Sequence, residues 1–211
     1  MFVGKRMKSE VVTVSPEDTL HRAGALLKEH RIHHLPVLAG GNLVGIVTDT
    51  DIRNARLEET PQAAPGSAAL EHRKVGEVMT RDVVTLSPVD TIEDAALILH
   101  QKRFEAIPVV ENRKLVGIIA KADVIAAFLA TLNIGEVGVR VEVVLPQDTA
   151  SVLGLIRQLG EMKLAIRSLV LSPRGENYVA FVRVPTIDVA AVKDRLRAAG
   201  FLVPGVAEFL E

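Results

Sequence analysis

The sequence predicts an α+β protein with two copies of one short unit, followed by a third unit of a different kind. Three observations support this prediction: a repeat at an offset of 72 residues, hydrophobic periods that alternate between those of strands and helices, and a change of pattern after residue 133. The chain has 211 residues, 48% of them apolar and none of them Cys, so it is long enough to bury aliphatic cores without disulfide bonds.

The repeat is visible without gaps. Residues 13–52 and 85–124 share 15 identities in 40 positions, and Leu43-Val-Gly-Ile46 returns as Leu115-Val-Gly-Ile118. We therefore expect the same local structure twice.

Each copy is predicted as a short strand, a helix, two strands and a second helix. In the first copy, Ser15-Pro16-Glu17-Asp18 is expected to start the first helix, because Ser accepts from unpaired amides and Pro suits the first helical position. The segments Leu35–Leu38 and Leu43–Val47 have strand character and are separated by Gly40-Gly41-Asn42, which is typical of a hairpin turn. A second helix is expected to begin near Asp49.

The domain plan follows from these patterns. We expect a first repeat at 1–57, a linker at 58–72, a second repeat at 73–132 and a final unit at 137–211. The linker is predicted because Glu58–Leu70 contains Pro and Gly and shows neither the helical nor the strand period.

The final unit has the order βαββαβ, which is ferredoxin-like. Val139, Val141, Val143 and Leu145 alternate with other residues, as expected for a half-buried strand. The remaining elements are a helix over 152–159, strands over 164–171 and 178–184, a helix over 189–196 and a last strand at 201–203.

Gly45-Ile-Val-Thr48-Asp-Thr-Asp51 is the first candidate site, because it lies where a buried strand is predicted to turn into a helix. Free amides at a helix start favour anions, and a carboxylate one turn later can accept both hydroxyls of a ribose. Thr-x-x-Asp is also a helix-capping motif that needs no ligand. The second copy, Gly117–Asp123, has Ala120 at the capping position, so we expect that Asp123 completes no capping box and that ligand binding explains the pair better.

Two copies of this pattern, each opened by Met-x-x-x-Val-Val-Thr (Met7–Thr13 and Met79–Thr85) and containing His-Leu-Pro-Val or Ala-Ile-Pro-Val, resemble a CBS-domain pair, or Bateman module, over residues 1–130. The resemblance implies adenosine ligands in two clefts, with Thr48 and Asp51 in one and Asp123 in the other. It also implies base-facing walls from Val11, Val12, Leu35, Pro36, Val83, Val84, Ile107 and Pro108.

Cations for a phosphate group are sought near the two helix starts. The candidates are Arg31, His33, His34, Arg53 and Lys121, each of which can equally be a solvated surface charge. No metal site is expected, because adjacent strand residues such as His33 and His34 point to opposite faces and no other His or Cys completes a ligand set.

The final unit resembles an ACT domain, a small regulatory module that often binds amino acids and pairs through its sheet. Its Gln147-Asp-Thr-Ala150 loop lacks the Gly that the ACT ligand loop usually contains, so sheet-mediated dimerisation or partner docking is the safer expectation. A CBS pair followed by an ACT-like unit is similar to the AcuB type of acetoin-utilisation accessory protein.

Composition limits the function classes. Lys and Arg number 25 against 26 Asp and Glu, aromatic residues make up 3%, and no run approaches 18 apolar residues, so we expect no nucleic-acid partner and no membrane span. No nucleophile elbow, Walker loop or His-Glu-x-x-His helix is present, so we expect no enzyme. Residues 1–10 lack the apolar core of a signal peptide, and a cytoplasmic protein is expected.

The leading hypothesis is a non-catalytic, homodimeric regulatory module that binds AMP, ADP, ATP or S-adenosylmethionine. It would signal to a partner enzyme in acetoin or central carbon metabolism. The alternative is a dimeric interaction scaffold whose clefts are vestigial.

Overall fold

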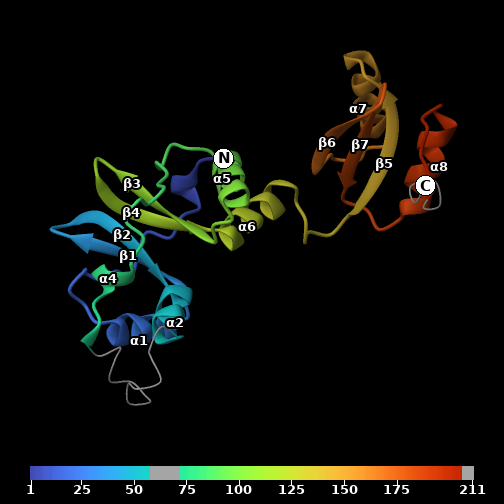
Figure 1. The fold of residues 1–211 in the computed structure, drawn as a ribbon. Coiled ribbons are helices and arrows are strands. Elements are labelled where there is room, and N and C mark those ends of the chain that lie inside the picture. Colours follow the sequence, from blue (N-terminus) through green and yellow to red (C-terminus); the bar gives the residue numbers. More distant parts are fainter. Residues whose placement is uncertain (58–71, 206–211) are drawn as a thin grey trace. The chain divides into compact units, whose positions relative to one another are not determined.

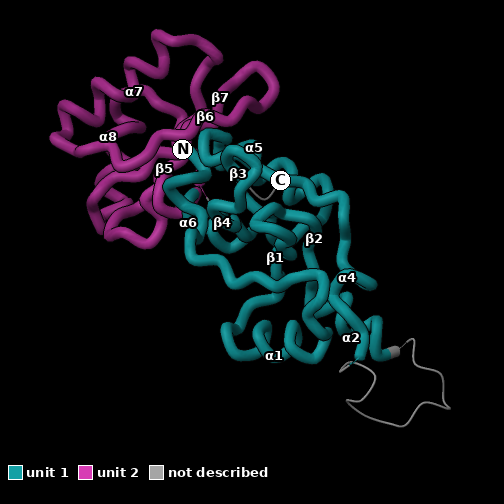
Figure 2. The backbone as a smooth tube through the Cα atoms, turned by 90° about the vertical axis from the view of Figure 1, so that its left-hand side faces the viewer, with its two compact units in different colours: residues 1–127 teal, residues 128–211 magenta. Residues whose placement is uncertain are grey.

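The computed structural model describes residues 1–57 and 72–205. The chain forms two compact units, Met1–Ala127 and Phe128–Glu211 (Figures 1 and 2). Of the predicted linker 58–72, all but His72 lies outside the described residues.

The first unit contains the two repeats in nearly identical form. The first repeat comprises α1 (Leu20–His30), β1 (His34–Ala39), β2 (Asn42–Thr48) and α2 (Asp49–Leu57). The second comprises α5 (Ile92–Lys102), β3 (Ala106–Glu111), β4 (Lys114–Ala120) and α6 (Lys121–Thr131). The short helices η1 (Val3–Lys5) and α4 (Val75–Val78) precede the two repeats, and the four strands form one sheet in the order β1-β2-β4-β3.

The first helix of each repeat begins later than predicted. Thr19 caps α1 by accepting from the amide of Arg22 at 3.2 Å, and Ser15 instead donates its amide to Asp18 in a turn (2.7 Å). The prediction of a helix start at Ser15 is therefore wrong. The reason is tertiary, because the carbonyl of Asp18 accepts from the amide of Val75 (2.8 Å) and this pairing keeps the preceding residues out of the helix.

Tight turns join the paired strands, as the glycines of the first repeat predict. Gly40 and Gly41 both have positive φ, at 56° and 81°, which a two-residue hairpin of the favoured twist requires. In the second repeat Asn112 and Arg113 adopt the same conformation, with φ of 50° and 65°.

The opening segment of each repeat lies against the strand of the other repeat. Thr80 exchanges two backbone hydrogen bonds of 2.9 Å with Ile46 on β2, and Lys8 exchanges bonds of 2.9 and 3.0 Å with Ile118 on β4. The two repeats therefore complete each other and fold as one unit.

Glycines on the central strands permit this crossing. A Cβ at Gly45 would lie 2.5 Å from Sδ of Met79, and one at Gly117 would lie 2.5 Å from Sδ of Met7. Both glycines of the repeated Leu-Val-Gly-Ile motif are thus required by close packing rather than by backbone conformation.

The second unit contains β5 (Val139–Pro146), α7 (Thr149–Glu161), β6 (Ser168–Arg174), β7 (Asn177–Val184) and α8 (Val189–Ala198). Its antiparallel sheet has the order β5-β7-β6, and both helices pack on one face, with Leu155 and Leu196 in the core. The predicted last strand at 201–203 is reduced to one bridge between Leu202 and Val144.

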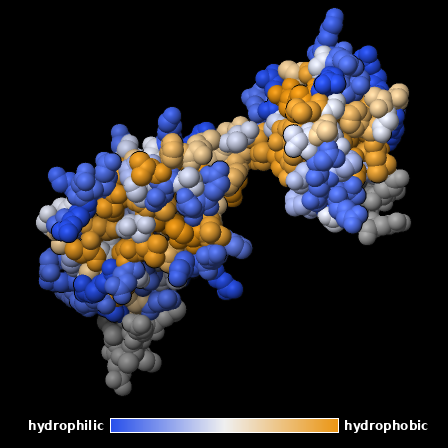
Figure 3. Space-filling model, turned by 90° about the horizontal axis from the view of Figure 1, so that it is seen from above, coloured by the Kyte–Doolittle hydropathy of each residue, from blue (hydrophilic) through white to orange (hydrophobic). Residues whose placement is uncertain are grey.

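Hydrophilic and apolar residues both reach the surface of each unit on the face seen in Figure 3. Among the described residues, no helix combines the length and the hydropathy that crossing a bilayer demands.

Candidate functional site

A cleft of about 520 Å³ opens in the first unit between the two repeats. We call it the inter-repeat cleft. The first repeat contributes His33, His34, Ile46 and Thr48–Asp51, and the second contributes Thr80, Asp82, Val83, Val84, Arg103–Ala106 and Pro108. Its volume lies in the range of about 300–1,000 Å³ that is usual for small-molecule sites.

The crossing of the opening segments explains why the cleft has walls from both repeats. Thr80 pairs with β2 of the first repeat, whereas Leu86 donates to the carbonyl of Pro108 on β3 of the second (3.1 Å). Val83 and Val84 lie on the stretch between these two anchor points. The structure therefore brings Val83, Val84 and Pro108 together with Thr48 and Asp51.

Thr48 and Asp51 form a complete capping box at the start of α2. Oδ2 of Asp51 accepts from the amide of Thr48 at 2.8 Å and from its hydroxyl at 2.7 Å, while Oγ1 of Thr48 accepts from the amide of Asp51 at 3.2 Å. Within residues 1–57 and 72–205, Oδ1 of Asp51 accepts no hydrogen bond. One carboxylate oxygen at the cleft wall is therefore available for a ligand.

Asp123 also takes part in capping, against our expectation. Its Oδ2 accepts from the amide of Ala120 at 2.9 Å, so half of the capping box survives without a hydroxyl. Asp123 can cap α6 without a Thr at position 120, because its carboxylate needs only the backbone amide of that residue; the expectation that it has no capping role is wrong.

Ionisable side chains gather where β1 begins, next to the start of α2. Nδ1 of His33 lies 3.5 Å from Oδ2 of Asp49, and Nη2 of Arg53 lies 3.1 Å from the same oxygen. Burial lowers the pKa of the half-buried His34 and the neighbouring His33 lowers it further, against the opposing effects of Asp49, Glu105 and Asp51. At neutral pH, His34 is therefore an uncharged hydrogen-bonding group in the cleft.

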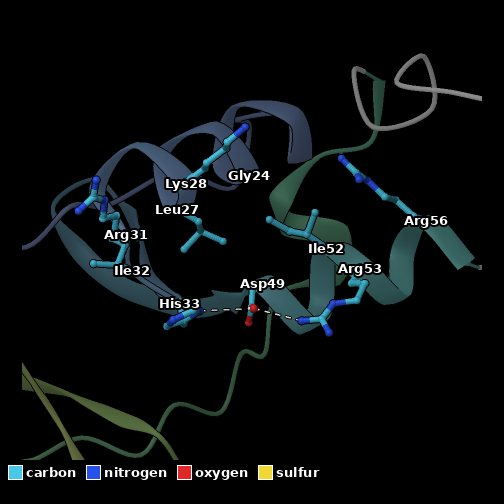
Figure 4. A pocket seen from close by; sticks show the side chains of 10 residues that line it. All are labelled: Gly24, Leu27, Lys28, Arg31, Ile32, His33, Asp49, Ile52, Arg53 and Arg56. Carbon is cyan, nitrogen blue, oxygen red and sulfur yellow. Dashed lines mark hydrogen bonds and ion pairs between the residues drawn. The ribbon is translucent and has the colours of Figure 1, made fainter. Parts of the chain in front are cut away.

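Three of the predicted phosphate-binding cations line a different hollow. Arg31, His33 and Arg53 border an open groove of about 570 Å³ between α1 and α2, together with Lys28 and Arg56. In Figure 4, Leu27 and Ile52 form its apolar floor and His33 and Arg53 flank Asp49. Of the three, only His33 also reaches the inter-repeat cleft.

Several predicted wall residues are placed differently from expectation. Leu35 and Ile107 are 0% exposed and belong to the two cores of the first unit, and neither lines the inter-repeat cleft. Pro36 is buried, Val11 is half-buried and Val12 packs on the first core. Lys121 forms an ion pair with Glu105, a residue of the cleft.

Several residues of the cleft were not predicted from the sequence, above all Arg103, Phe104 and Glu105. The repeat offset contained the signal, because Glu105 is the counterpart of His33 in the second repeat. This correspondence places Glu105 near Asp51 only when the two repeats are known to line the same cleft.

Residues 3–58 and 75–130 each match the family model described as "CBS domain". The chain belongs to the CBS-domain family. Two CBS domains thus form the tandem pair of the first unit.

Curated relatives match this CBS pair. The CBS domain-containing protein YhcV of Bacillus subtilis is 36% identical over 117 residues, which cover 56% of this chain and 78% of YhcV. An inosine-5'-monophosphate dehydrogenase of Korarchaeum cryptofilum is 37% identical over 116 residues, which cover 54% of this chain but 22% of the dehydrogenase. The likeness to this enzyme therefore concerns its CBS portion.

Solved structures agree with the fold of the pair. The CBS pair of protein MJ0100, in complex with 5'-methylthioadenosine and S-adenosyl-L-methionine, is 26% identical with a TM-score of 0.53, covering 62% of this chain and 97% of that one. CBSX2 in complex with AMP is 29% identical with a TM-score of 0.53, covering 61% and 96%. A Vibrio cholerae protein named as an acetoin utilization protein (AcuB) is 27% identical with a TM-score of 0.55, covering 63% and 93%.

Proposed function

We propose that the chain is a non-catalytic regulatory module that binds an adenosine nucleotide or a related adenosyl ligand in the inter-repeat cleft. The observation that carries the proposal is the free Oδ1 of Asp51 in a cleft whose walls include Val83, Val84, Phe104 and Pro108. The carboxylate suits ribose hydroxyls and the apolar walls suit a base. MJ0100 and CBSX2, which share the fold of the pair, were solved with 5'-methylthioadenosine and S-adenosyl-L-methionine and with AMP, respectively.

The charge of the cleft favours ligands with little negative charge. Four carboxylates line it, from Asp49, Asp51, Asp82 and Glu105, against the guanidinium of Arg103 and two histidines. A triphosphate would meet repulsion from these acids, whereas the sulfonium and ammonium groups of S-adenosylmethionine would not. We therefore expect S-adenosylmethionine and AMP to bind more tightly than ATP.

Calorimetric titration of the full chain with AMP, ADP, ATP and S-adenosylmethionine tests the proposal. Asp51→Ala should weaken binding at least about tenfold, since hydrogen bonds to a charged group are among the stronger ones. Asp94→Ala is the matched control: Asp94 forms the same box with Thr91 at the start of α5, outside the cleft. Absence of heat with all four ligands, or equal affinities in the two variants, would refute nucleotide binding.

A dimeric scaffold with vestigial clefts is the second candidate. It is favoured by the capping roles of Asp51 and Asp123, which account for both carboxylates without a ligand. Exposed apolar residues on the second repeat, Leu97 on α5 (53%) and Ile125 on α6 (58%), offer a surface for homodimerisation. Light scattering with and without ligand separates the candidates, because the scaffold predicts a stable dimer that is indifferent to nucleotides.

We further propose that residues 137–211 form an ACT-like module that transmits the ligand state to a partner enzyme. The element order and the bridge of Leu202 beside β5 support this assignment. A link to acetoin or central carbon metabolism rests on the likeness of the CBS pair to the Vibrio cholerae protein. Co-purification of a metabolic enzyme with the full chain, but not with a chain that ends at residue 132, is the expected result.

A further inference from the structure

A third, smaller cavity lies in the second unit, on the sheet face opposite the helices. Along β5 and β7, residues such as Val141 and Val182 point into the core, so Arg140 and Arg183, which alternate with them, point to the other face. There they border a cavity of about 200 Å³. This volume is below the usual range for drug-sized ligands and suits a molecule of a few carbon atoms.

Two like charges face each other across the strands at this cavity. Arg140 on β5 is the direct partner of Arg183 on β7, and the next residue in the same row is Ser168 on β6. Directly opposed residues in an antiparallel pair have Cβ atoms about 4.5–5.5 Å apart, and like charges there are destabilising. The row of Arg140, Arg183 and Ser168 therefore contains two positive charges and no negative one.

The two guanidinium groups are compensated unequally. Arg140 forms an ion pair of 2.6 Å with Glu142 and stacks over the ring of Phe181 at 5.2 Å. Arg183 is half-buried, donates from Nη2 to the carbonyl of Glu136 at 3.1 Å, and has a buried Nε without a hydrogen-bond partner. No carboxylate of the described residues pairs with Arg183. A half-buried guanidinium group without a counter-ion is costly, and an anion in the cavity would reduce that cost.

The rest of the lining is apolar and carries no acid. Phe181 and Val170 are cross-strand partners in the neighbouring row, and Leu132 and Ile134 close one side. An ammonium group would find no carboxylate among the lining residues. The cavity thus offers cationic donors at one end and aliphatic contacts at the other.

We propose that this cavity binds a small aliphatic carboxylate that has no amino group, with its carboxylate at Arg183 and Arg140 and its carbon chain against Phe181 and Val170. Such a ligand would accept hydrogen bonds from the guanidinium groups and offset the repulsion between the two arginines. The cavity is distinct from the inter-repeat cleft, since all its lining residues belong to the second unit.

Calorimetric titration of the full chain with 3-methylbutanoate tests the proposal, with 3-methylbutanamide and leucine as comparison ligands. The carboxylate should bind, the neutral amide should bind about tenfold more weakly or less, and leucine should be weaker than the carboxylate because its ammonium has no acceptor. Inorganic phosphate, an anion without a carbon chain, should also be weaker.

Two variants and a control sharpen the test. Arg183→Met and Arg140→Gln should each weaken carboxylate binding about tenfold or more, whereas Arg157→Gln on the exposed face of α7 should leave it unchanged. Without ligand, Arg183→Met should change the melting temperature little, because losing the hydrogen bond to the carbonyl of Glu136 opposes the relief of repulsion between the two arginines. If Arg183→Met fails to fold, the expectation about its stability is wrong, and the carboxylate affinity of Arg140→Gln then tests the proposed binding.

Three results would overturn the proposal: no heat with 3-methylbutanoate, equal affinity for the acid and the amide, or unchanged affinity in the arginine variants. A concentration-dependent dimer that Arg183→Met dissociates, without any carboxylate binding, would assign the face to a second copy of the chain instead.

Discussion

Replacing Asp51 with Ala tests how much of the first site is already used by helix capping. Oδ2 of Asp51 accepts two hydrogen bonds from Thr48, whereas Oδ2 of Asp123 accepts one from Ala120. At about 1 kcal/mol for each hydrogen bond, Asp51→Ala should lower the free energy of unfolding by about 2 kcal/mol and Asp123→Ala by about 1 kcal/mol. For a unit of this size, the melting temperature should fall by roughly 3 °C per kcal/mol.

Differential scanning calorimetry without ligand measures both losses, in the transition that belongs to the first unit. A Thr48→Ala background provides the control, because without the hydroxyl Asp51 retains one bond, as Asp123 does. In that background Asp51→Ala should cost about 1 kcal/mol, which gives a coupling energy of about 1 kcal/mol between the two side chains. Equal losses for Asp51→Ala and Asp123→Ala in the natural background would show that the Thr48 hydroxyl adds nothing, and the reasoning would fail.

Further predictions concern packing and pH. Gly45→Ala and Gly117→Ala should each destabilise the first unit by about 1–3 kcal/mol, because the new Cβ would lie 2.5 Å from a methionine sulfur. At Gly160 on α7 a new Cβ would meet nothing within 4 Å, so Gly160→Ala should instead stabilise the second unit by about 0.5–1 kcal/mol. Urea unfolding measures the stability of all three variants, and a Gly45→Ala variant as stable as the natural chain would contradict the close packing. Since the folded pKa of His34 is lowered from 6.5, the unfolded chain takes up its proton first and stability should be lost as pH falls through about 6.5. His34→Gln should flatten that loss in melting curves recorded between pH 8 and pH 5, and an unchanged slope would show that His34 does not cause it.

Local structure followed closely from the sequence where local chemistry decides it. The hairpin at Gly40 and Gly41 is confirmed because two positive φ values are demanded by the turn itself. The start of α1 was misplaced because Ser15 and Thr19 are both competent caps, and the choice between them depends on the pairing of Asp18 with Val75. No local pattern contains that information.

The composition of the inter-repeat cleft was only partly predictable, for a related reason. Thr48 and Asp51 were found through their chemistry, and Val83, Val84 and Pro108 through the resemblance. The crossing of the opening segments decides which valines lie beside Thr48 and Asp51. The crossing consists of long-range backbone pairing, and backbone pairing of this kind requires no particular residue types that a sequence could reveal. Burial of Leu35 and Ile107 was likewise hidden, since strands covered on both faces lack the alternation that would identify the exposed side.

The two halves of the pair are not equivalent, because their sequences differ at the starts of α2 and α6. With the repeat offset of 72, the Asp123 half has Ala120 in place of Thr48, Lys121 in place of Asp49 and Ile125 in place of Arg53. The first half therefore presents a full capping box beside a carboxylate that is paired with Arg53, and the second presents half a box beside a lysine that is paired with Glu105. Because Glu105 itself lines the inter-repeat cleft, a change in the pairing of Lys121 would alter the charge that a ligand at Asp51 meets. The charge near Asp51 therefore depends in part on Lys121, a residue of the second repeat.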